Sequence, residues 1–287
     1  AFVVQRLSPG KALHPTVLGT VRQQGRHIQA GLPVESDTIW RIFSMTKPIT
    51  AVLALQLWEE GAFELNDPVY RYIPAFRKTK VWRSGSVNSP VLDPVTEPMR
   101  LWQLFAHTAG LTYGFMYAHP VDELYRRAGF EWGAPKDHDL AGVCDALAEL
   151  PLLFQPGREW NYSMGLDVLG RVLEVVSGQP LDELMRTRLL EPLGMHDTVA
   201  ESTMEAIPDA VTPYFPRFAA DTRYGPDPMR ELQLSCYAGA GSFVSTASDL
   251  VRFGMAVEAG TLLQPTTLRQ LRTSQRLPSG SETGYGL

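Results

Sequence analysis

The sequence predicts an α+β protein, in which short strands lie near both ends of the chain and most of the helices lie between them. Apolar residues repeat at helical spacing over 49–58 and 164–176, a period typical of packed helices. β-like pieces occur at 2–4 and 16–21, and apolar residues return at 243–245 after a glycine-rich turn. We therefore expect a fold that combines strands and helices.

Length and composition restrict the classes of protein that fit. The chain has 287 residues, 44% of them hydrophobic, which suits one large or two smaller domains with a sizeable core. A net charge of −5 provides no basic stripe for nucleic acid. No apolar run is long enough to span a bilayer, so we expect neither a nucleic-acid partner nor a membrane partner.

The cysteines and the start of the chain bear on location. Cys144 and Cys236 lie on very different segments and are expected to be free thiols, as in a reducing compartment. The residues after Ala1 lack the charged and apolar regions of a signal peptide. These features favour a cytoplasmic protein, although a leader that has already been removed is compatible with the same start.

The segment around Ser44 is the clearest candidate for chemistry. Residues 49–58 are apolar on every side, which predicts a buried helix. Gly61 is suited to end it, and Pro48 fits only in its first turn. Ser44 is therefore expected at the N-terminus of a buried helix.

Lys47 follows Ser44 by three residues, a spacing that places two side chains on one helix face. A neutral lysine amine there could accept the serine proton, and the positive end of the helix dipole would favour an oxyanion. A second Ser-x-x-Lys match at Ser8 contains a Pro-Gly turn and is interpreted as a loop. From this local pattern alone, Ser44 is equally well explained as the N-cap of a core helix.

The remaining elements follow from local signals. Arg26 to Gln29 continue the strand pair begun by 2–4 and 16–21, and prolines between Thr79 and Pro98 predict a long irregular loop. A helix is expected from Pro98 through Ala106, before a turn that contains His107. Further expectations are Asp137 as the cap of a helix carrying 140–147, a helix over 181–190, Thr246 as the cap of a helix to Val257, and a strand that begins at Gly284.

Other catalytic patterns are missing from the sequence. No serine lies in Gly-x-Ser-x-Gly, the motif of α/β-hydrolases. No pair of histidines has zinc-ligand spacing. Residues 239–242 lack the third glycine of a dinucleotide-binding loop. We expect no metal ion and no cofactor.

Four blocks together resemble the serine β-lactamase and penicillin-binding-protein superfamily, and within it most of all the family VIII β-lactamase-like esterases, relatives of class C β-lactamases. They occur in the family's order, from about Pro33 onward. The blocks are Ser44-Met45-Thr46-Lys47, His107-Thr108-Ala109-Gly110-Leu111-Thr112-Tyr113-Gly114, Asn161-Tyr162-Ser163 and Gly241-Ser242-Phe243-Val244-Ser245-Thr246.

The resemblance implies a β-lactamase/transpeptidase-like fold, with an antiparallel sheet flanked by helices and an inserted all-helical domain. The α/β part would comprise 1–62 and 235–287, and the helical part 63–234. The site would lie in the cleft between the two parts.

The resemblance also assigns roles to residues. Ser44 would be the acylated nucleophile, Lys47 its proton acceptor, and Tyr162 the group that relays protons to the leaving group and activates water. These roles make the chain a serine hydrolase of small carboxylic esters. The residues expected to contact the substrate are Tyr113, Phe115, Trp132, Gly241 and Ser242, and the alternative for the aromatic ones is plain core packing.

Two departures from the family pattern shape the expected activity. Class C β-lactamases carry Asn two residues after the tyrosine, where this chain has Met164, which cannot hydrogen-bond a β-lactam amide. This favours simple esters over β-lactams as substrates. A β-lactamase, a D-alanyl carboxypeptidase or a transacylase on the same site, or a non-catalytic acyl-trapping homologue, remains the alternative. The second is that no Lys-Thr-Gly motif follows, since Glu282-Thr283-Gly284 resembles it only superficially. We expect the chain to be a fragment, its later strands supplied by a second fragment or an oligomer partner.

Overall fold

The computed structural model describes residues 2–4, 16–18, 37–131, 133–135, 138–200 and 238–286. Its central sheet is antiparallel, with β7 (Phe243–Ser245) between β3 (Trp40–Arg41) and β6 (Val199–Ala200). The strand pair predicted near the start is present as β1 (Phe2–Val4) and β2 (Thr16–Leu18). Residues 26–29 lie outside the described residues. The sheet thus joins segments that are far apart in the sequence, as the α+β prediction required.

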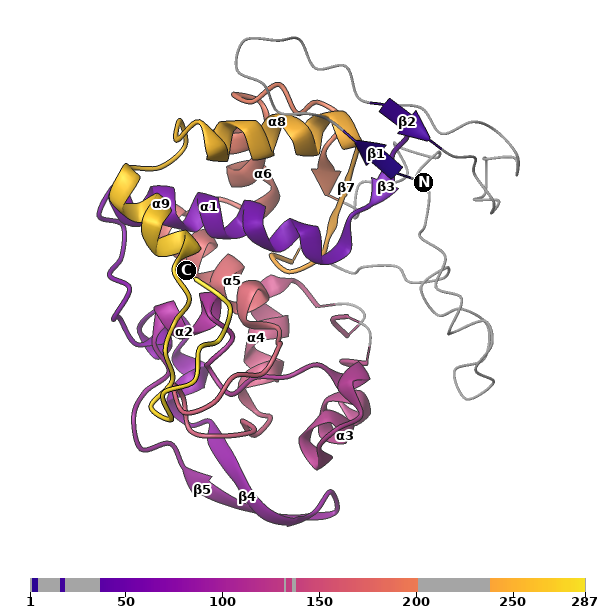
Figure 1. Ribbon diagram of the computed structural model, residues 1–287. Helices are drawn as coiled ribbons and strands as arrows, with labels where there is room; N and C mark the ends of the chain where they lie inside the picture. Colours follow the sequence, from indigo (N-terminus) through magenta and orange to yellow (C-terminus); the bar gives the residue numbers. More distant parts are fainter. Residues whose placement is uncertain are drawn as a thin grey trace, which may run out of the picture.

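Helix α1 (Thr46–Glu59) follows β3 in the chain, and α8 (Ala247–Glu258) follows β7 (Figure 1). Ten of its fourteen residues are buried, as its all-round apolar pattern predicted. Pro48 lies in its first turn, and Gly61, just past its end, has φ 79°. Full burial of each large apolar side chain contributes about 1.5–3 kcal/mol, so α1 is a fixed support for the residues at its start.

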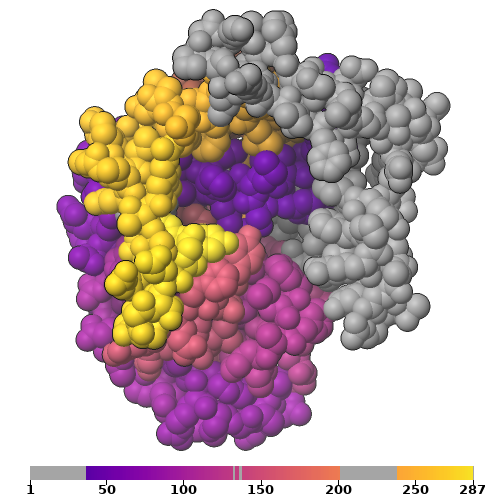
Figure 2. Space-filling view, viewed as in Figure 1, coloured from indigo at the N-terminus to yellow at the C-terminus, as the bar shows by residue number. Residues whose placement is uncertain are grey.

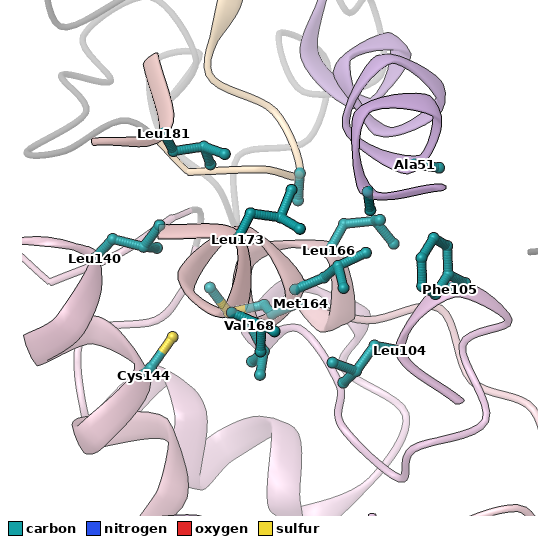
Figure 3. Close-up of a cluster of buried hydrophobic side chains, with 14 of the residues drawn as sticks. Ala51, Leu104, Phe105, Leu140, Cys144, Met164, Leu166, Val168, Leu173 and Leu181 are labelled. Atoms are coloured by element: carbon teal, nitrogen blue, oxygen red, sulfur yellow. The ribbon is translucent and has the colours of Figure 1, made fainter. Parts of the chain in front are cut away.

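Helix α5 (Gly165–Ser177) is the centre of a group of packed helices. It contacts α1, α2 (Leu101–Phe105), α4 (Leu140–Ala148) and α6 (Leu181–Met185). Its apolar residues repeat at helical spacing and are almost all buried, so one helix is shared by several neighbours. Figure 3 shows this cluster, with Met164, Leu166, Val168 and Leu173 of the α5 segment meeting Leu104 and Phe105, Leu140 and Cys144, Ala51, and Leu181.

Two glycines bring main chains into direct contact near the start of α5. A Cβ on Gly165 would lie 2.6 Å from the carbonyl oxygen of Leu104, and one on Gly239 would lie 2.2 Å from that of Leu166. Both positions therefore require glycine for close approach of the backbone. Thr50 of α1 donates to the carbonyl oxygen of Gly239 at 2.7 Å, so α1, residue 239 and α5 are stacked.

Residues 80–94 form a β-hairpin, and the predicted irregular loop is wrong there. β4 (Lys80–Ser86) pairs antiparallel with β5 (Ser89–Pro94), at the end of the molecule away from the central sheet (Figure 1). The prolines at 90 and 94 lie opposite residues of β4. β4 also bonds Leu152 on its other side, so β5, which carries both prolines, is the edge strand of the hairpin, where proline is tolerated.

Helix boundaries differ slightly from the predicted ones. α4 begins after Asp139, whose side chain accepts the N–H of Gly142 at 2.8 Å, so the prediction of Asp137 as its cap is wrong. Thr246 does cap α8, accepting the N–H of Asp249. The predicted 181–190 helix is α6 followed by a π-helical turn, Arg186–Leu190. The other α-helices described are α3 (Pro120–Arg127) and α9 (Pro265–Arg272), and short 3₁₀ helices lie at Val69–Arg71, Pro74–Arg77 and Gly114–Met116.

The last described residues form an irregular loop, and the strand predicted from Gly284 is not formed there. Gly284 adopts φ 74°. The carbonyl oxygen of Tyr285 accepts the N–H of Gln275 at 2.8 Å, and its ring stacks on Trp160. The Tyr285 ring therefore holds this segment against residues from the middle of the chain.

The cysteines and the lengths of the apolar helices bear on the expectations from composition. Cys144 is a buried free thiol in α4, and Cys236 lies outside the described residues. No helix in the described part of the chain is both long and apolar enough to cross a membrane.

Candidate active site

Ser44 lies in a 3₁₀ turn, Phe43–Met45, directly before α1. Phe43 has φ 45°, an uncommon backbone conformation for a residue with a side chain. Ser44 is exposed, whereas Lys47 is buried. The Nζ of Lys47 donates to the Ser44 Oγ at 3.0 Å. The contact predicted from the three-residue spacing is therefore formed.

Lys47 is held in a mostly closed environment. Its Nζ also donates to the carbonyl oxygen of Ala240 at 2.8 Å, and it faces the rings of Tyr162 and Tyr113 at 4.8 and 5.5 Å from their centres. Burial lowers the pKa of Lys47 to about 8, with the charge of Asp167 acting in the opposite direction. At neutral pH roughly a tenth of such lysines carry no proton and can accept one.

Asp167 supplies a negative charge that acts on this lysine. It lies in the first turn of α5 and is 3% exposed, and its carboxylate accepts the N–H of Ala240 at 2.9 Å. Burial raises the pKa of Asp167 to about 6, while Lys47 and the Ala240 N–H lower it. At neutral pH the carboxylate is therefore mostly ionised and favours the ammonium form of Lys47.

Tyr162 precedes α5 and reaches the same point from that group of packed helices. Its hydroxyl hydrogen-bonds Ser44. Burial raises the pKa of Tyr162, the bond to Ser44 lowers it, and the charge of Asp167 raises it. The phenol thus stays protonated at neutral pH and can pass its proton along the contact with Ser44.

Aromatic side chains surround this group. Tyr113 stacks on Phe115 with ring centres 4.8 Å apart, and Trp160 stacks on Tyr285 at 5.4 Å. Figure 2 shows one face hollowed, with the colour of the α1 region at its floor and the C-terminal segment at its side. Aromatic side chains beside an exposed serine are suited to contact the acyl group of a small molecule.

The predicted site residues have different outcomes. The structure brings Ser44, Lys47 and Tyr162 together, with Tyr113 and Phe115 beside them. Tyr113 is only 8% exposed, and its ring faces Lys47. Trp132 lies outside the described residues.

The loop predicted to contact the substrate lies beside the turn that carries Ser44. Gly241 lies close to the main chain of Phe43: a Cβ added to Gly241 would be 3.7 Å from the carbonyl carbon of Phe43. Ser242 is 2% exposed, and its Oγ accepts the N–H of Ala238 at 2.9 Å within the turn. The main chain of this loop, through Ala240, is what reaches Lys47.

Three residues of the site were missed by sequence reasoning. Asp167 carried a signal, since it is an acid among the apolar residues of 164–176. His107 was interpreted as a turn residue, yet it is 1% exposed and lies 4.8 Å from the Tyr162 ring. Trp160 gave no signal beyond its closeness to Tyr162 in sequence.

Met164 occupies the position at which class C β-lactamases carry an asparagine side-chain amide. Met164 caps α5 and is 3% exposed, with its side chain in the core cluster of Figure 3. Among the described residues, no group of three or more His, Cys, Asp or Glu side chains could hold a metal ion.

Comparison with known proteins places the chain in a family. The family model described as Beta-lactamase matches residues 4–287, and the chain belongs to the beta-lactamase family. The predicted superfamily and fold are thereby confirmed.

Two curated proteins and one solved structure are among those similar to this chain. Esterase EstB of Burkholderia gladioli is 33% identical over 279 residues, covering 90% of this chain and 67% of EstB. Protein Rv1367c of Mycobacterium tuberculosis is 36% identical over 260 residues, covering 87% of this chain and 63% of that protein. A solved structure, "EstCE1, a hydrolase with promiscuous acyltransferase activity", is 27% identical with a TM-score of 0.69, covering 85% of this chain and 65% of that one. The chain thus spans about two thirds of the length of each.

Proposed function

We propose that this protein is a serine hydrolase that cleaves small carboxylic esters through an acyl-enzyme on Ser44. The observation that carries the proposal is the contact of the Lys47 Nζ with the Ser44 Oγ at 3.0 Å, in surroundings that lower the pKa of Lys47 to about 8. A buried amine of this kind is a proton acceptor for the nucleophile.

The reaction begins when the Ser44 Oγ attacks the ester carbonyl carbon and its proton passes to neutral Lys47. The negative oxygen that forms lies near the N-terminus of α1, where the helix dipole is favourable. Tyr162, in hydrogen-bond contact with Ser44, gives a proton to the departing alkoxide, and the alcohol leaves. The Lys47 ammonium then returns its proton to the Tyr162 oxygen. Water attacks the acyl-enzyme and loses a proton to the Tyr162–Lys47 pair, which passes it to the Ser44 Oγ as the acyl–Ser44 bond breaks. The carboxylic acid and free Ser44 are released.

Esters are favoured over β-lactams for a local reason. The position that would offer a side-chain amide is Met164, which is buried and packs into the core. A β-lactam amide placed here would lose water contacts without gaining a hydrogen bond from that position, and an unpaired polar group is costly. The amide concerned is the acylamino side chain that penicillins and cephalosporins carry, and a simple ester has no such group to satisfy.

Kinetics on purified protein test the proposal. Short-chain p-nitrophenyl esters should be hydrolysed with a burst of one nitrophenol per Ser44, and Ser44→Ala should lower the rate to background while the circular dichroism spectrum stays the same. A cephalosporin preferred by a large margin would replace the esterase with a β-lactamase or a D-alanyl carboxypeptidase.

Acyl transfer is a second candidate, favoured by the similarity to EstCE1, a hydrolase described as having promiscuous acyltransferase activity. The same acyl-enzyme would then be attacked by an alcohol in place of water. Adding a short alcohol to the ester assay and measuring the new ester by mass spectrometry separates the two. A non-catalytic acyl-trapping protein would instead give the burst with no steady turnover.

The whole protein's activity also depends on what completes the site. We propose that a further segment, a second fragment or an oligomer partner supplies the remaining strands of the sheet, because the chain spans only 63% to 67% of the curated relatives above. Activity that rises when a longer form of the protein is assayed beside this chain would support the proposal, and equal activity would count against it.

A further inference from the structure

His107 lies directly behind Tyr162, in the turn after α2. Its φ of 56° is in the left-handed region, and its side chain is 1% exposed. A buried residue in this conformation persists only where its surroundings hold it. Neither the nucleophile nor the lysine requires a histidine here, so the contacts of its ring need an explanation.

His107 binds the main chain on both sides of Tyr162. Its carbonyl oxygen accepts the N–H of Asn161 at 3.0 Å, and its Nδ1 accepts the N–H of Ser163 at 3.2 Å. The Ser163 Oγ lies 3.1 Å from the same Nδ1. The residues before and after Tyr162 are therefore both fixed to one residue.

The ring of His107 also touches the tyrosine itself. The centres of the two rings are 4.8 Å apart, with an angle of 49° between their planes. Because a backbone N–H donates to Nδ1, that nitrogen carries a lone pair, and the proton of the neutral ring is on Nε2. Burial, and next the charge of Lys47, lower the pKa of His107 to about 3. The His107 ring is therefore uncharged between pH 5 and 7, well above this pKa.

We propose that His107 is a positioning residue that fixes the Tyr162 hydroxyl relative to Ser44 and Lys47 by holding the main chain of residues 161 and 163. This rests on the proposed function of Tyr162 as the proton relay. A displacement of about 1 Å in a reacting group can lower a rate by on the order of 100-fold. An imidazole that bonds the flanking backbone and never titrates can act in this way without exchanging a proton itself.

Two substitutions separate the role of the acceptor from that of the ring. His107→Asn places a carbonyl oxygen near the position of Nδ1, and asparagine tolerates a positive φ. His107→Gly also accepts the backbone conformation but offers neither acceptor nor ring. The Asn variant should keep kcat within about threefold, and the Gly variant should lose about 10- to 100-fold in kcat with KM within about threefold.

His119 provides a matched control. Its Nδ1 accepts the N–H of Val121 at 3.1 Å at the start of α3, and its ring contacts Trp82, not Tyr162. His119→Gly thus removes a similar acceptor for a backbone N–H and should leave kcat unchanged. A loss in this control equal to that in His107→Gly would overturn the positioning role.

The remaining outcomes are also decisive. A folded His107→Gly variant with wild-type kcat, or a folded His107→Asn variant that loses more than about tenfold, would overturn the inference. If the Gly variant fails to fold, the Asn variant decides through kcat and its pH profile, which should match the wild type between pH 5 and 7. A change there would show that His107 titrates. Absence of turnover in the wild-type protein would refute the proposed function and not the placement of Tyr162.

Discussion

Lys47 and Asp167 are bound to the two sides of a single residue, Ala240. The lysine Nζ donates to the Ala240 carbonyl oxygen at 2.8 Å, and the Ala240 N–H donates to the Asp167 carboxylate at 2.9 Å. The loop that carries Ala240 thus holds a cation and an anion near each other inside the protein. The charge of Asp167 raises the pKa of Lys47, and the charge of Lys47 lowers the pKa of Asp167, so each group favours the ionised form of the other.

Ester hydrolysis should rise with pH through a midpoint near 8. The pKa of Lys47 is lowered to about 8 by burial, so the amine is mostly protonated below this pH and mostly free above it. Only the free amine can accept the Ser44 proton. The measurement is kcat/KM from pH 6 to 10. A flat profile, or one that falls over this range, would contradict the role of Lys47.

Asp167→Asn should move that midpoint to lower pH. The carboxylate raises the pKa of Lys47, so its removal makes the amine lose its proton more readily. Asp249→Asn is the control: Asp249 is another buried carboxylate, which accepts the N–H of Asp197 at 3.0 Å and bonds Arg252. It should lower stability without moving the midpoint, and equal shifts in the two variants would show that the effect is indirect.

Tyr162→Phe should lower kcat by about 10²- to 10⁴-fold, the usual contribution of a proton-transfer group. The phenyl ring retains its contacts with His107 and Lys47, so the near-ultraviolet circular dichroism should change little. Burst and steady-state phases should be measured separately. Wild-type turnover in this variant would remove Tyr162 from the mechanism.

Gly165→Ala should destabilise the protein by about 1–3 kcal/mol, as expected for overpacking. The new methyl group would lie 2.6 Å from the main-chain oxygen of Leu104, which no change of rotamer can relieve. Gly254→Ala on α8 is the control, because its methyl group meets nothing within 4 Å and a helix favours alanine over glycine. Urea unfolding of both variants should show opposite signs of change.

Patterns within a few residues predicted much of this molecule. The all-round apolar run at 49–58 and the spacing of Ser44 from Lys47 led to a buried helix with its nucleophile at the start. The prolines of 79–98 misled, because their effect depends on whether a strand is central or at an edge, which is a tertiary property. Asp167 and His107 were missed for a related reason: their partners, Ala240 and the main chain around Tyr162, lie 73 and 54 to 56 positions away.

The stacking of α1, residue 239 and α5 has a consequence for how such a protein can change. Helix α1 supports Ser44 and α5 follows Tyr162, and the packing of α1 against α5 depends on the close main-chain contact of Gly239 with Leu166 and on the bond from Thr50 to Gly239. Substitutions among the aromatic residues around the hollow can therefore alter which acyl groups are admitted while the proton-transfer geometry stays the same. Selection for a new substrate would then change these aromatic residues, while Ser44, Lys47 and Tyr162 would keep their arrangement.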